Sequence, residues 1–257
     1  MSALPFRSGP GHRGSLAWAD ARAVLFDLDG VLTPTNRLHE QAWEIVLSGF
    51  CRCRGLTPDY TTADYFAHVD GKPRLDGIRD FLASRDCQLP DGHPDDTAGD
   101  DTAWALANRK NNVFHEILRR DGIEPYPGTS DVLADARRHA KLAVVSSSRN
   151  AVAVLDAAGL ADSFAIVVDG QLAEREKLPG KPDPSVFCRA AALLGVRPED
   201  SAVVEDALSG VAAGRAGGFG LVVGVDRGAG HDALRRSGAD LVVSDLRALL
   251  DGWAEAG

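Results

Sequence analysis

Short runs of aliphatic residues alternate along this chain with alanine-rich stretches of helical length. The aliphatic runs cover residues 23–26, 142–148, 164–168, 201–206, 219–225 and 240–244. Runs of this kind are typical of strands that are buried on both faces of a parallel sheet. The alanine-rich stretches cover residues 129–140, 150–160, 184–195 and 207–217. The alternation therefore predicts an α/β fold, in which a Rossmann-like parallel sheet is wrapped by helices.

A long segment without such runs separates the first predicted strand from the second. Within residues 35–125, the stretches LHEQAWEIVLSGF and WALANRKNNVFHEILRR place apolar residues at helical spacing. This pattern predicts an α-helical cap domain inserted into the chain. The α/β core domain is then expected to consist of residues 1–34 and 126–257.

Charge and cysteine content exclude several classes of function. The formal net charge of -9 at pH 7 argues against a broad surface for nucleic acid or anionic lipid. No apolar run is long enough to span a bilayer. The four cysteines lack both paired metal spacing and the density of a disulfide scaffold. We therefore expect a cytoplasmic protein, a monomer or weak dimer, with no nucleic-acid or membrane partner.

The strongest chemical motif is Asp27-Leu28-Asp29-Gly30, which directly follows the first aliphatic run. Ligands of open α/β sheets bind beyond the carboxyl ends of the strands, so both carboxylates are expected at that edge. Two adjacent acids favour a bound cation, and Mg²⁺ is a hard cation that takes carboxylate oxygens and bridges to phosphate. The alternative is a solvated turn after a strand, because such short motifs also occur by chance.

Polar residues also follow three later strands. Ser146, Ser147, Ser148, Arg149 and Asn150 follow the second run, Lys181 lies in a Gly/Pro loop, and Glu205 with Asp206 ends the fourth run. Hydroxyls and backbone N–H groups at a helix start can hold phosphate oxygens, and a lysine can balance the charge. Each motif alone has a structural explanation, such as a helix cap, a surface lysine or acids at a helix start. Their order at separate strand ends favours one common site.

In these motifs the chain resembles the haloacid dehalogenase (HAD) superfamily, over about residues 23–249. The matching residues are Asp27 with Asp29, Ser146, Lys181, and Glu205 with Asp206. The resemblance implies the HAD fold and phosphoryl transfer through an aspartyl phosphate. Such transfer depends mainly on positioning and on neutralising the charge of the phosphoryl oxygens.

The resemblance also implies a role for each matching residue. Asp27 is expected to be the nucleophile, and Asp29 the general acid and then the general base. Ser146 and Lys181 are expected to steady the transferring group. The implied Mg²⁺ ligands are Asp27, the carbonyl of Asp29, and Asp206, with Glu205 assisting. Because neighbouring carboxyl groups titrate apart, a protonated Asp29 beside an ionised Asp27 is expected.

Within the superfamily, the chain resembles β-phosphoglucomutase and its relatives most closely in the predicted cap. Thr35, His39 and Trp43 keep that family's spacing from the nucleophile. His39 and Trp43 are four residues apart and would share a helix face. An aromatic ring can flank a sugar, although Trp43 could equally be buried in the packing of the cap.

Basic residues of the predicted cap extend this resemblance. Gly71 and Arg74 resemble the loop whose arginine holds the non-reacting phosphate, and Lys110 lies in the last predicted cap helix. Arg149 and Asn150 match core residues that grip the distal phosphate. Arginine is suited to bidentate phosphate contact, whereas a solvated charged face is the alternative. The expected substrate-binding residues are Thr35, His39, Trp43, Gly71, Arg74, Lys110, Ser147, Ser148, Arg149 and Asn150.

The resulting functional prediction is interconversion of β-glucose 1-phosphate and glucose 6-phosphate, through a bound bisphosphate and with Mg²⁺. The main alternative is a phosphatase acting on a small sugar or polyol phosphate. Two positions depart from the family's pattern: Pro34, at a hinge position where relatives usually have an acid, and Asp70 of the cap, where the mutase has a lysine. A catalytically retired binding protein is disfavoured, because clustered acids are costly to retain without a use.

Overall fold

The centre of the molecule is a parallel sheet. The computed structural model describes residues 16–70, 72–97 and 99–250. Within them, six strands pair in the order β3-β2-β1-β4-β5-β6, and every pairing is parallel. The strands are β1 (Ala23–Phe26), β2 (Lys141–Val145), β3 (Ile166–Val168), β4 (Ser201–Glu205), β5 (Leu221–Val225) and β6 (Leu241–Val243). The predicted α/β fold with a parallel sheet is therefore confirmed.

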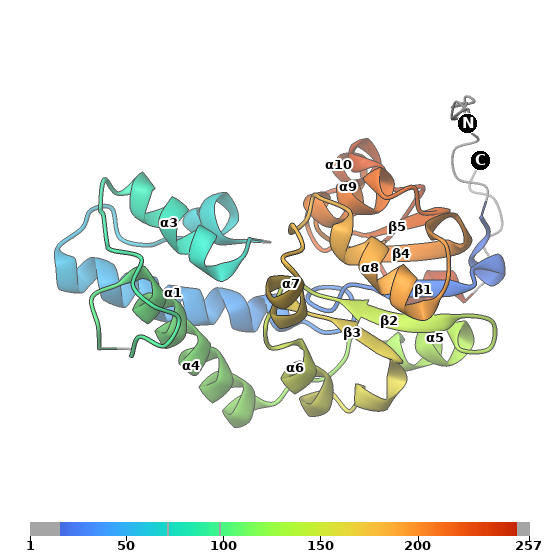
Figure 1. The fold of residues 1–257 in the computed structure, drawn as a ribbon, viewed down its shortest axis with the longest axis horizontal. Helices are drawn as coiled ribbons and strands as arrows, with labels where there is room; N and C mark the ends of the chain where they lie inside the picture. Colours follow the sequence, from blue (N-terminus) through green and yellow to red (C-terminus); the bar gives the residue numbers. More distant parts are fainter. Residues whose placement is uncertain (1–15, 71, 98, 251–257) are drawn as a thin grey trace, which may run out of the picture.

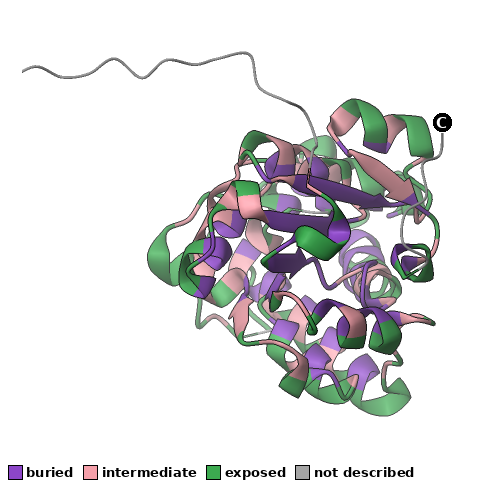
Figure 2. Ribbon diagram, turned by 90° about the vertical axis from the view of Figure 1, so that its right-hand side faces the viewer, coloured by how far each residue is buried: buried purple, intermediate pink, exposed green. Residues whose placement is uncertain are grey.

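Helices cover both faces of this sheet (Figure 1). The first face packs against α5 (Thr129–Ala136), α6 (Ala151–Ala157) and the 3₁₀ turn η5 (Leu246–Leu249). The second face packs against α7 (Gly170–Glu176), α8 (Ser185–Leu194), α9 (Leu208–Ala216) and α10 (His231–Ser237). Figure 2 shows the central strands as buried between helices whose outer sides are exposed. Burial of a large side chain such as Phe26 or Phe187 contributes about 1.5–3 kcal/mol, and neither is exposed.

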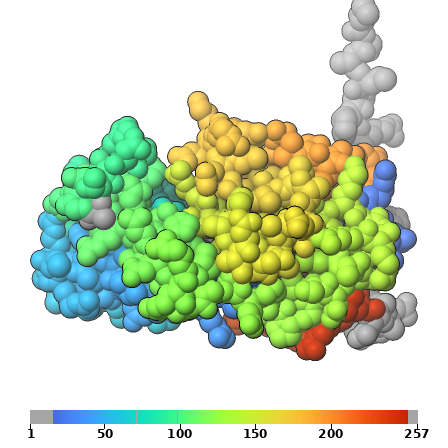
Figure 3. Space-filling view, turned by 90° about the horizontal axis from the view of Figure 1, so that it is seen from below, coloured from blue at the N-terminus to red at the C-terminus, as the bar shows by residue number. Residues whose placement is uncertain are grey.

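The inserted segment forms a helical layer beyond one end of the sheet. Its helices are α1 (Thr35–Arg54), α2 (Thr62–Asp64), α3 (Arg74–Ser84) and α4 (Ala103–Asp121), with a π-helical turn at Tyr65–Val69. They enclose a separate apolar cluster that includes Trp43, Ile78 and Phe81. Figure 3 shows this helical segment and the sheet segment as two lobes side by side. The domain boundaries at residues 34/35 and 125/126 stay a prediction.

Helix α4 connects the two lobes. Its first half contributes Ala103, Leu106 and Ala107 to the cap cluster. Its second half contributes Phe114 and Ile117, together with Leu118, to the cluster that lies under the sheet. Side chains of one helix are therefore fixed by both lobes, and α4 can carry polar groups to the boundary between them.

Two observations bear on thiols and membranes. Cys51, Cys53, Cys87 and Cys188 are all free in the structure. Among the helices of the described ranges, none combines the length and apolar character that a bilayer span requires.

Candidate active site

The loop after β1 places two carboxylates at the carboxyl edge of the sheet. Asp27 is buried, and its N–H donates to the carbonyl of Val204 on β4 at 2.9 Å. The chain then turns at Gly30, whose φ is +93° and whose N–H donates to the carbonyl of Thr33 at 2.8 Å. A Cβ at Gly30 would lie 2.0 Å from Oδ2 of Asp206. Glycine is therefore required here for its positive φ and for the close approach of Asp206.

Lys181 connects two of the predicted acids. Its Nζ lies 2.5 Å from Oδ1 of Asp27 and 2.6 Å from Oε1 of Glu205, and it also donates to the carbonyl of Val145 at 3.3 Å. Burial would lower the pKa of Lys181, but the charges of Asp27 and Glu205 outweigh it and raise that pKa. The lysine is therefore held as a buried ammonium ion, with carboxyl oxygens of Asp27 and Glu205 as its partners.

The acids at this edge outnumber the ammonium group. Burial raises the pKa of Asp27 to about 8, against the opposing charge of Lys181. Burial and the charges of Glu205 and Asp27 raise the pKa of Asp206 well above its ordinary value. Both oxygens of Glu205 already accept hydrogen bonds, from Lys181 and from the N–H of Ala207. By contrast, no hydrogen bond reaches the Asp206 carboxylate from the described part of the chain.

This arrangement fits a divalent cation between Asp27 and Asp206. A cation would compensate the Asp206 carboxylate, which has no ammonium partner among the described residues, and the Asp27 carboxylate, whose partner Lys181 is shared with Glu205. In the described ranges, no group of three or more His, Cys, Asp or Glu side chains could hold a metal ion. Mg²⁺ usually binds one or two protein carboxylates and fills its remaining positions with waters and substrate phosphate, so Asp27 and Asp206 would suffice as its side-chain ligands. The predicted assisting role of Glu205 stays a prediction.

Asp29 lies in a set of hydrogen-bond donors. Thr35 Oγ1 donates to its Oδ1, Ser146 Oγ donates to its Oδ2 at 2.9 Å, and Nε2 of His39 lies 3.7 Å from its Oδ1. Burial alone would raise the pKa of Asp29, but contacts with His39, Thr35 and Ser146 outweigh it and lower the pKa to about 2. The expected protonated Asp29 beside an ionised Asp27 is therefore not what these contacts favour. The protonation states of the two residues during catalysis stay a prediction.

The serine-rich loop follows β2 and leads into α6. Ser146 is buried, and its hydroxyl donates to Asp29. The N–H of Ser148 donates to the Ser146 Oγ at 3.0 Å. The Ser148 hydroxyl accepts from the N–H of Asn150 at 3.1 Å. Ser147 and Arg149 are exposed. The loop is thus preorganised by its own hydroxyls, and Ser146 is brought to the two carboxylates as the motif order predicts.

Lys110 of the cap is connected to Asp29 through His39. Nζ of Lys110 lies 2.5 Å from Nδ1 of His39, whose ring stacks on Phe114 at 4.3 Å. Nζ also lies 5.3 Å from the ring centroid of Trp43. Burial and the charge of Lys110 lower the pKa of His39 to about 4, so the imidazole is neutral at neutral pH. Burial also lowers the pKa of Lys110 well below its ordinary value. Trp43 is buried in the cap cluster, and its contact with Lys110 connects it to the site.

Arg74 of the cap is connected to Asn150 of the core through Asn111, which was not among the predicted substrate-binding residues. Its Nη2 donates to Oδ1 of Asn111 at 2.9 Å, and Nδ2 of Asn150 donates to the same oxygen at 2.8 Å. Burial and the charge of Arg149 lower the pKa of Arg74 to about 10. Arg149 points to Glu174, at 3.0 Å. A cap arginine and a core amide therefore converge on one acceptor oxygen, a pattern that suits a phosphate oxygen as well.

Asn111 was not among the predicted substrate-binding residues, because its partners lie 37 and 39 residues away and on different lobes. Its position beside Lys110 on α4 was the one available signal. Gly71 lies outside the described residues. All other predicted site residues lie in the described ranges, and the structure brings most of them to the boundary between sheet and cap.

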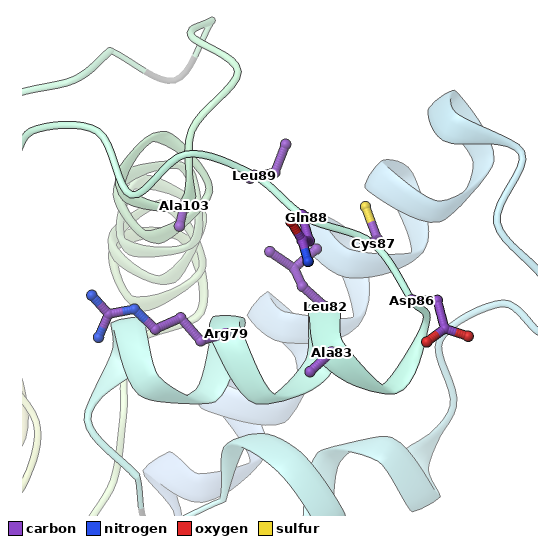
Figure 4. A pocket seen from close by; sticks show the side chains of 8 residues that line it. All are labelled: Arg79, Leu82, Ala83, Asp86, Cys87, Gln88, Leu89 and Ala103. Carbon is purple, nitrogen blue, oxygen red and sulfur yellow. The ribbon is translucent and has the colours of Figure 1, made fainter.

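A surface hollow of about 480 Å³ lies elsewhere, on the cap (Figure 4). It is lined by Arg79, Leu82, Ala83, Asp86, Cys87, Gln88, Leu89 and Ala103. None of the predicted site residues lines it, and its walls carry no convergent set of polar groups. The chemistry is therefore assigned to the edge of the sheet and not to this hollow.

Known proteins resemble this chain over most of its length. Residues 21–218 match the family of haloacid dehalogenase-like hydrolases. A β-phosphoglucomutase of Mycobacterium bovis is 48% identical over 239 residues, which cover 89% of this chain and 91% of the relative. One from Bacillus subtilis is 34% identical over 230 residues, with 88% and 91% covered. The crystal structure of a β-phosphoglucomutase from Clostridium difficile superposes with a TM-score of 0.73 at 26% identity, covering 89% of this chain and 93% of that one.

Proposed function

The chain belongs to the haloacid dehalogenase-like hydrolase family, and from this premise we propose that it interconverts β-glucose 1-phosphate and glucose 6-phosphate. Two β-phosphoglucomutases match it over nearly their whole length. The observation that carries the proposal is the pairing of two sites. The first site is Asp27 with Lys181 at the sheet edge. The second is formed by Arg74 and Asn150, which both donate to Oδ1 of Asn111. A sugar with two phosphates needs both.

In the proposed mechanism, a carboxylate oxygen of Asp27 attacks phosphorus while the bond from phosphorus to the sugar oxygen breaks. Asp29 gives a proton to that leaving oxygen and later takes one from the hydroxyl that attacks the aspartyl phosphate. Lys181 and the Ser146 hydroxyl hold phosphoryl oxygens in place. Mg²⁺, held by Asp27, Asp206 and the carbonyl of Asp29, would neutralise charge on the transferring group. The sugar bisphosphate then turns and presents its other phosphate to Asp27.

The proposed partner is a small sugar phosphate. Arg74, Arg149 and Asn150 would hold its distal phosphate, while Lys110 and His39 lie between that region and Asp29. Thr35, Trp43, Gly71, Ser147 and Ser148 remain predicted contacts of the substrate. A cytoplasmic location and a monomeric or weakly dimeric state also stay predictions.

The proposed contacts of Arg74, Arg149 and Asn150 with the distal phosphate give the test that separates a mutase from a phosphatase. With a trace of glucose 1,6-bisphosphate as primer, the enzyme is expected to convert β-glucose 1-phosphate to glucose 6-phosphate. Arg74→Ala should lower this flux by about 10–100-fold, because a charge-assisted hydrogen bond to phosphate is worth about 1.5–3 kcal/mol. Hydrolysis of p-nitrophenyl phosphate should change less than about twofold, since this substrate has no distal phosphate to lose.

Arg79→Ala is the matched control for this test. Arg79 lies on the same helix, five residues along, and its contacts are with Asp76 and Asp91 at the surface. It should leave both activities near those of the wild type. If the enzyme releases phosphate from β-glucose 1-phosphate and yields no glucose 6-phosphate even when primed, the protein is a phosphatase and the mutase assignment is refuted. Turnover of neither substrate would point to a binding protein.

Removal of divalent metal is expected to stop catalysis reversibly. EDTA should abolish turnover and excess Mg²⁺ should restore it. Asp206→Ala should raise the Mg²⁺ concentration for half-maximal activity by about tenfold or more, since Mg²⁺ holds few protein carboxylates and each contributes strongly. Asp232→Ala removes an exposed acid of α10 and should not shift the Mg²⁺ titration. Undiminished activity in EDTA would refute the metal requirement.

A further inference from the structure

Arg227 makes three contacts that join separate parts of the fold next to the site. It lies two residues beyond the end of β5. Its Nε donates to the carbonyl of Gly30 at 2.9 Å and its Nη1 to the carbonyl of Ser244 at 3.0 Å. The centre of its guanidinium lies 3.9 Å from the ring centroid of Tyr126. One side chain therefore connects the loop after β1, the loop after β6 and the segment that returns from the cap.

The Gly30 carbonyl belongs to the loop that carries Asp27 and Asp29. The N–H of Gly30 donates within the loop, to the carbonyl of Thr33, so the contact with Arg227 fixes the other polar group of the same residue. Glycine has more backbone freedom than any other residue. Without the guanidinium, the Gly30 peptide could rotate, and the neighbouring peptide of Asp29 would lose its fixed direction.

The contact with Tyr126 involves the second crossing between the cap and the core. The N–H of Tyr126 donates to the carbonyl of Leu32 at 2.9 Å, and Thr129 Oγ1 donates to the same carbonyl at 3.2 Å. The returning segment is thus attached to the same loop as Arg227. The planar guanidinium can bond carbonyls at its edge and stack on a ring with its face, which a lysine ammonium cannot do.

We propose that Arg227 is a positioning residue for phosphoryl transfer. It holds the Gly30 peptide against the Tyr126 ring, and so keeps Asp27 and Asp29 at fixed distances from Lys181 and Asp206. It contacts neither substrate nor metal in this role. The inference rests on the proposed function only for the choice of an activity assay.

The kinetic test compares Arg227→Ala, Arg227→Lys and a control, with p-nitrophenyl phosphate as substrate. Misplacement of reacting groups by about 1 Å can cost on the order of 10²-fold, so Arg227→Ala should lower kcat by about 10–100-fold with little change in KM. Guanidinium ion added at millimolar concentration should restore part of kcat in Arg227→Ala, and Arg227→Lys should remain impaired. The control is Arg137→Ala, because Arg137 also donates to two backbone carbonyls, those of Asp162 and Ser163, far from the site.

Hydrogen exchange supplies a second measurement that does not require activity. In Arg227→Ala, the amides of Gly30, Leu32 and Thr33 should exchange faster than in Arg137→Ala, because their hydrogen bonds close the loop. A kcat equal to that of the control, or exchange at these amides that is unchanged, would overturn the proposal. So would a loss of kcat that follows the melting temperature and is not restored by guanidinium. If the wild-type enzyme itself has no Mg²⁺-dependent turnover, the proposed function fails, and the exchange rates still decide the role of Arg227.

Discussion

Asp27→Asn is expected to lower turnover by about 10⁴-fold or more and to leave the fold intact. The amide is nearly the same size as the carboxylate but cannot attack phosphorus, so the covalent step is lost. Lys181 keeps its 2.6 Å contact with Glu205, and the exchange removes a carboxylate that burial disfavours. Steady-state rates with the sugar phosphate and with p-nitrophenyl phosphate, together with the melting temperature, measure both parts of the prediction.

Asp240→Asn is the matched control for this variant. Asp240 also pairs with a basic side chain, that of Arg215, and it accepts from the N–H of Val222 at 2.8 Å. It precedes β6, at the end of the sheet opposite the proposed site. Asp240→Asn should retain full activity, and Asp27→Asn should form no acid-stable or hydroxylamine-sensitive phosphoenzyme. Substantial turnover by Asp27→Asn would refute the nucleophile assignment.

Most of the fold could be predicted because strands of a parallel sheet are apolar on both faces. Each of the six aliphatic runs contains or overlaps a strand, as residues 164–168 contain β3 (Ile166–Val168). Helix α7 was not predicted, because its sequence GQLAERE has no buried side chain. Helix α10 was missed for a similar reason, since Leu234 is its one buried residue. Short helices that bury so little leave no periodic pattern in the sequence.

The core of the site could be predicted because a parallel sheet collects the ends of its strands at one edge. The acids that follow β1 and end β4, and Ser146 after β2, lie at such strand ends. Lys181 instead lies in the loop between α7 and α8, 154 residues from Asp27, and still reaches it at 2.5 Å. The contacts of Asn111 and Arg227 could not be predicted in this way. Asn111 accepts hydrogen bonds from side chains of both lobes. Arg227 donates to backbone carbonyls, and because every residue has one, the sequence does not mark these acceptors. The hydrogen bonds around Asp29 could not be predicted either, because sequence spacing does not specify the directions in which the His39, Thr35 and Ser146 side chains point.

The second large effect concerns Asp29, which the contacts described above favour as a carboxylate. To act as general acid, it must bind a proton before the sugar oxygen leaves. A bound phosphate adds negative charge beside Asp29, and like charges raise the pKa of a carboxyl group. The donors Thr35 and Ser146 oppose that shift. We therefore expect Asp29 to become protonated when substrate is bound. Its proton should contribute most to the rate for substrates with a poor leaving group.

Asp29→Asn should accordingly lower turnover of β-glucose 1-phosphate by about 10²–10⁴-fold, the usual contribution of a general acid or base. With acetyl phosphate the first step should be nearly normal, because its leaving group departs without a proton. A single-turnover experiment can separate the two steps, since Asp29→Asn should be phosphorylated on Asp27 by acetyl phosphate and should then accumulate the phosphoenzyme. Asp27→Asn should not be labelled at all, which provides the control. If Asp29→Asn loses labelling by acetyl phosphate as completely as Asp27→Asn does, Asp29 acts in positioning the nucleophile and not in proton transfer.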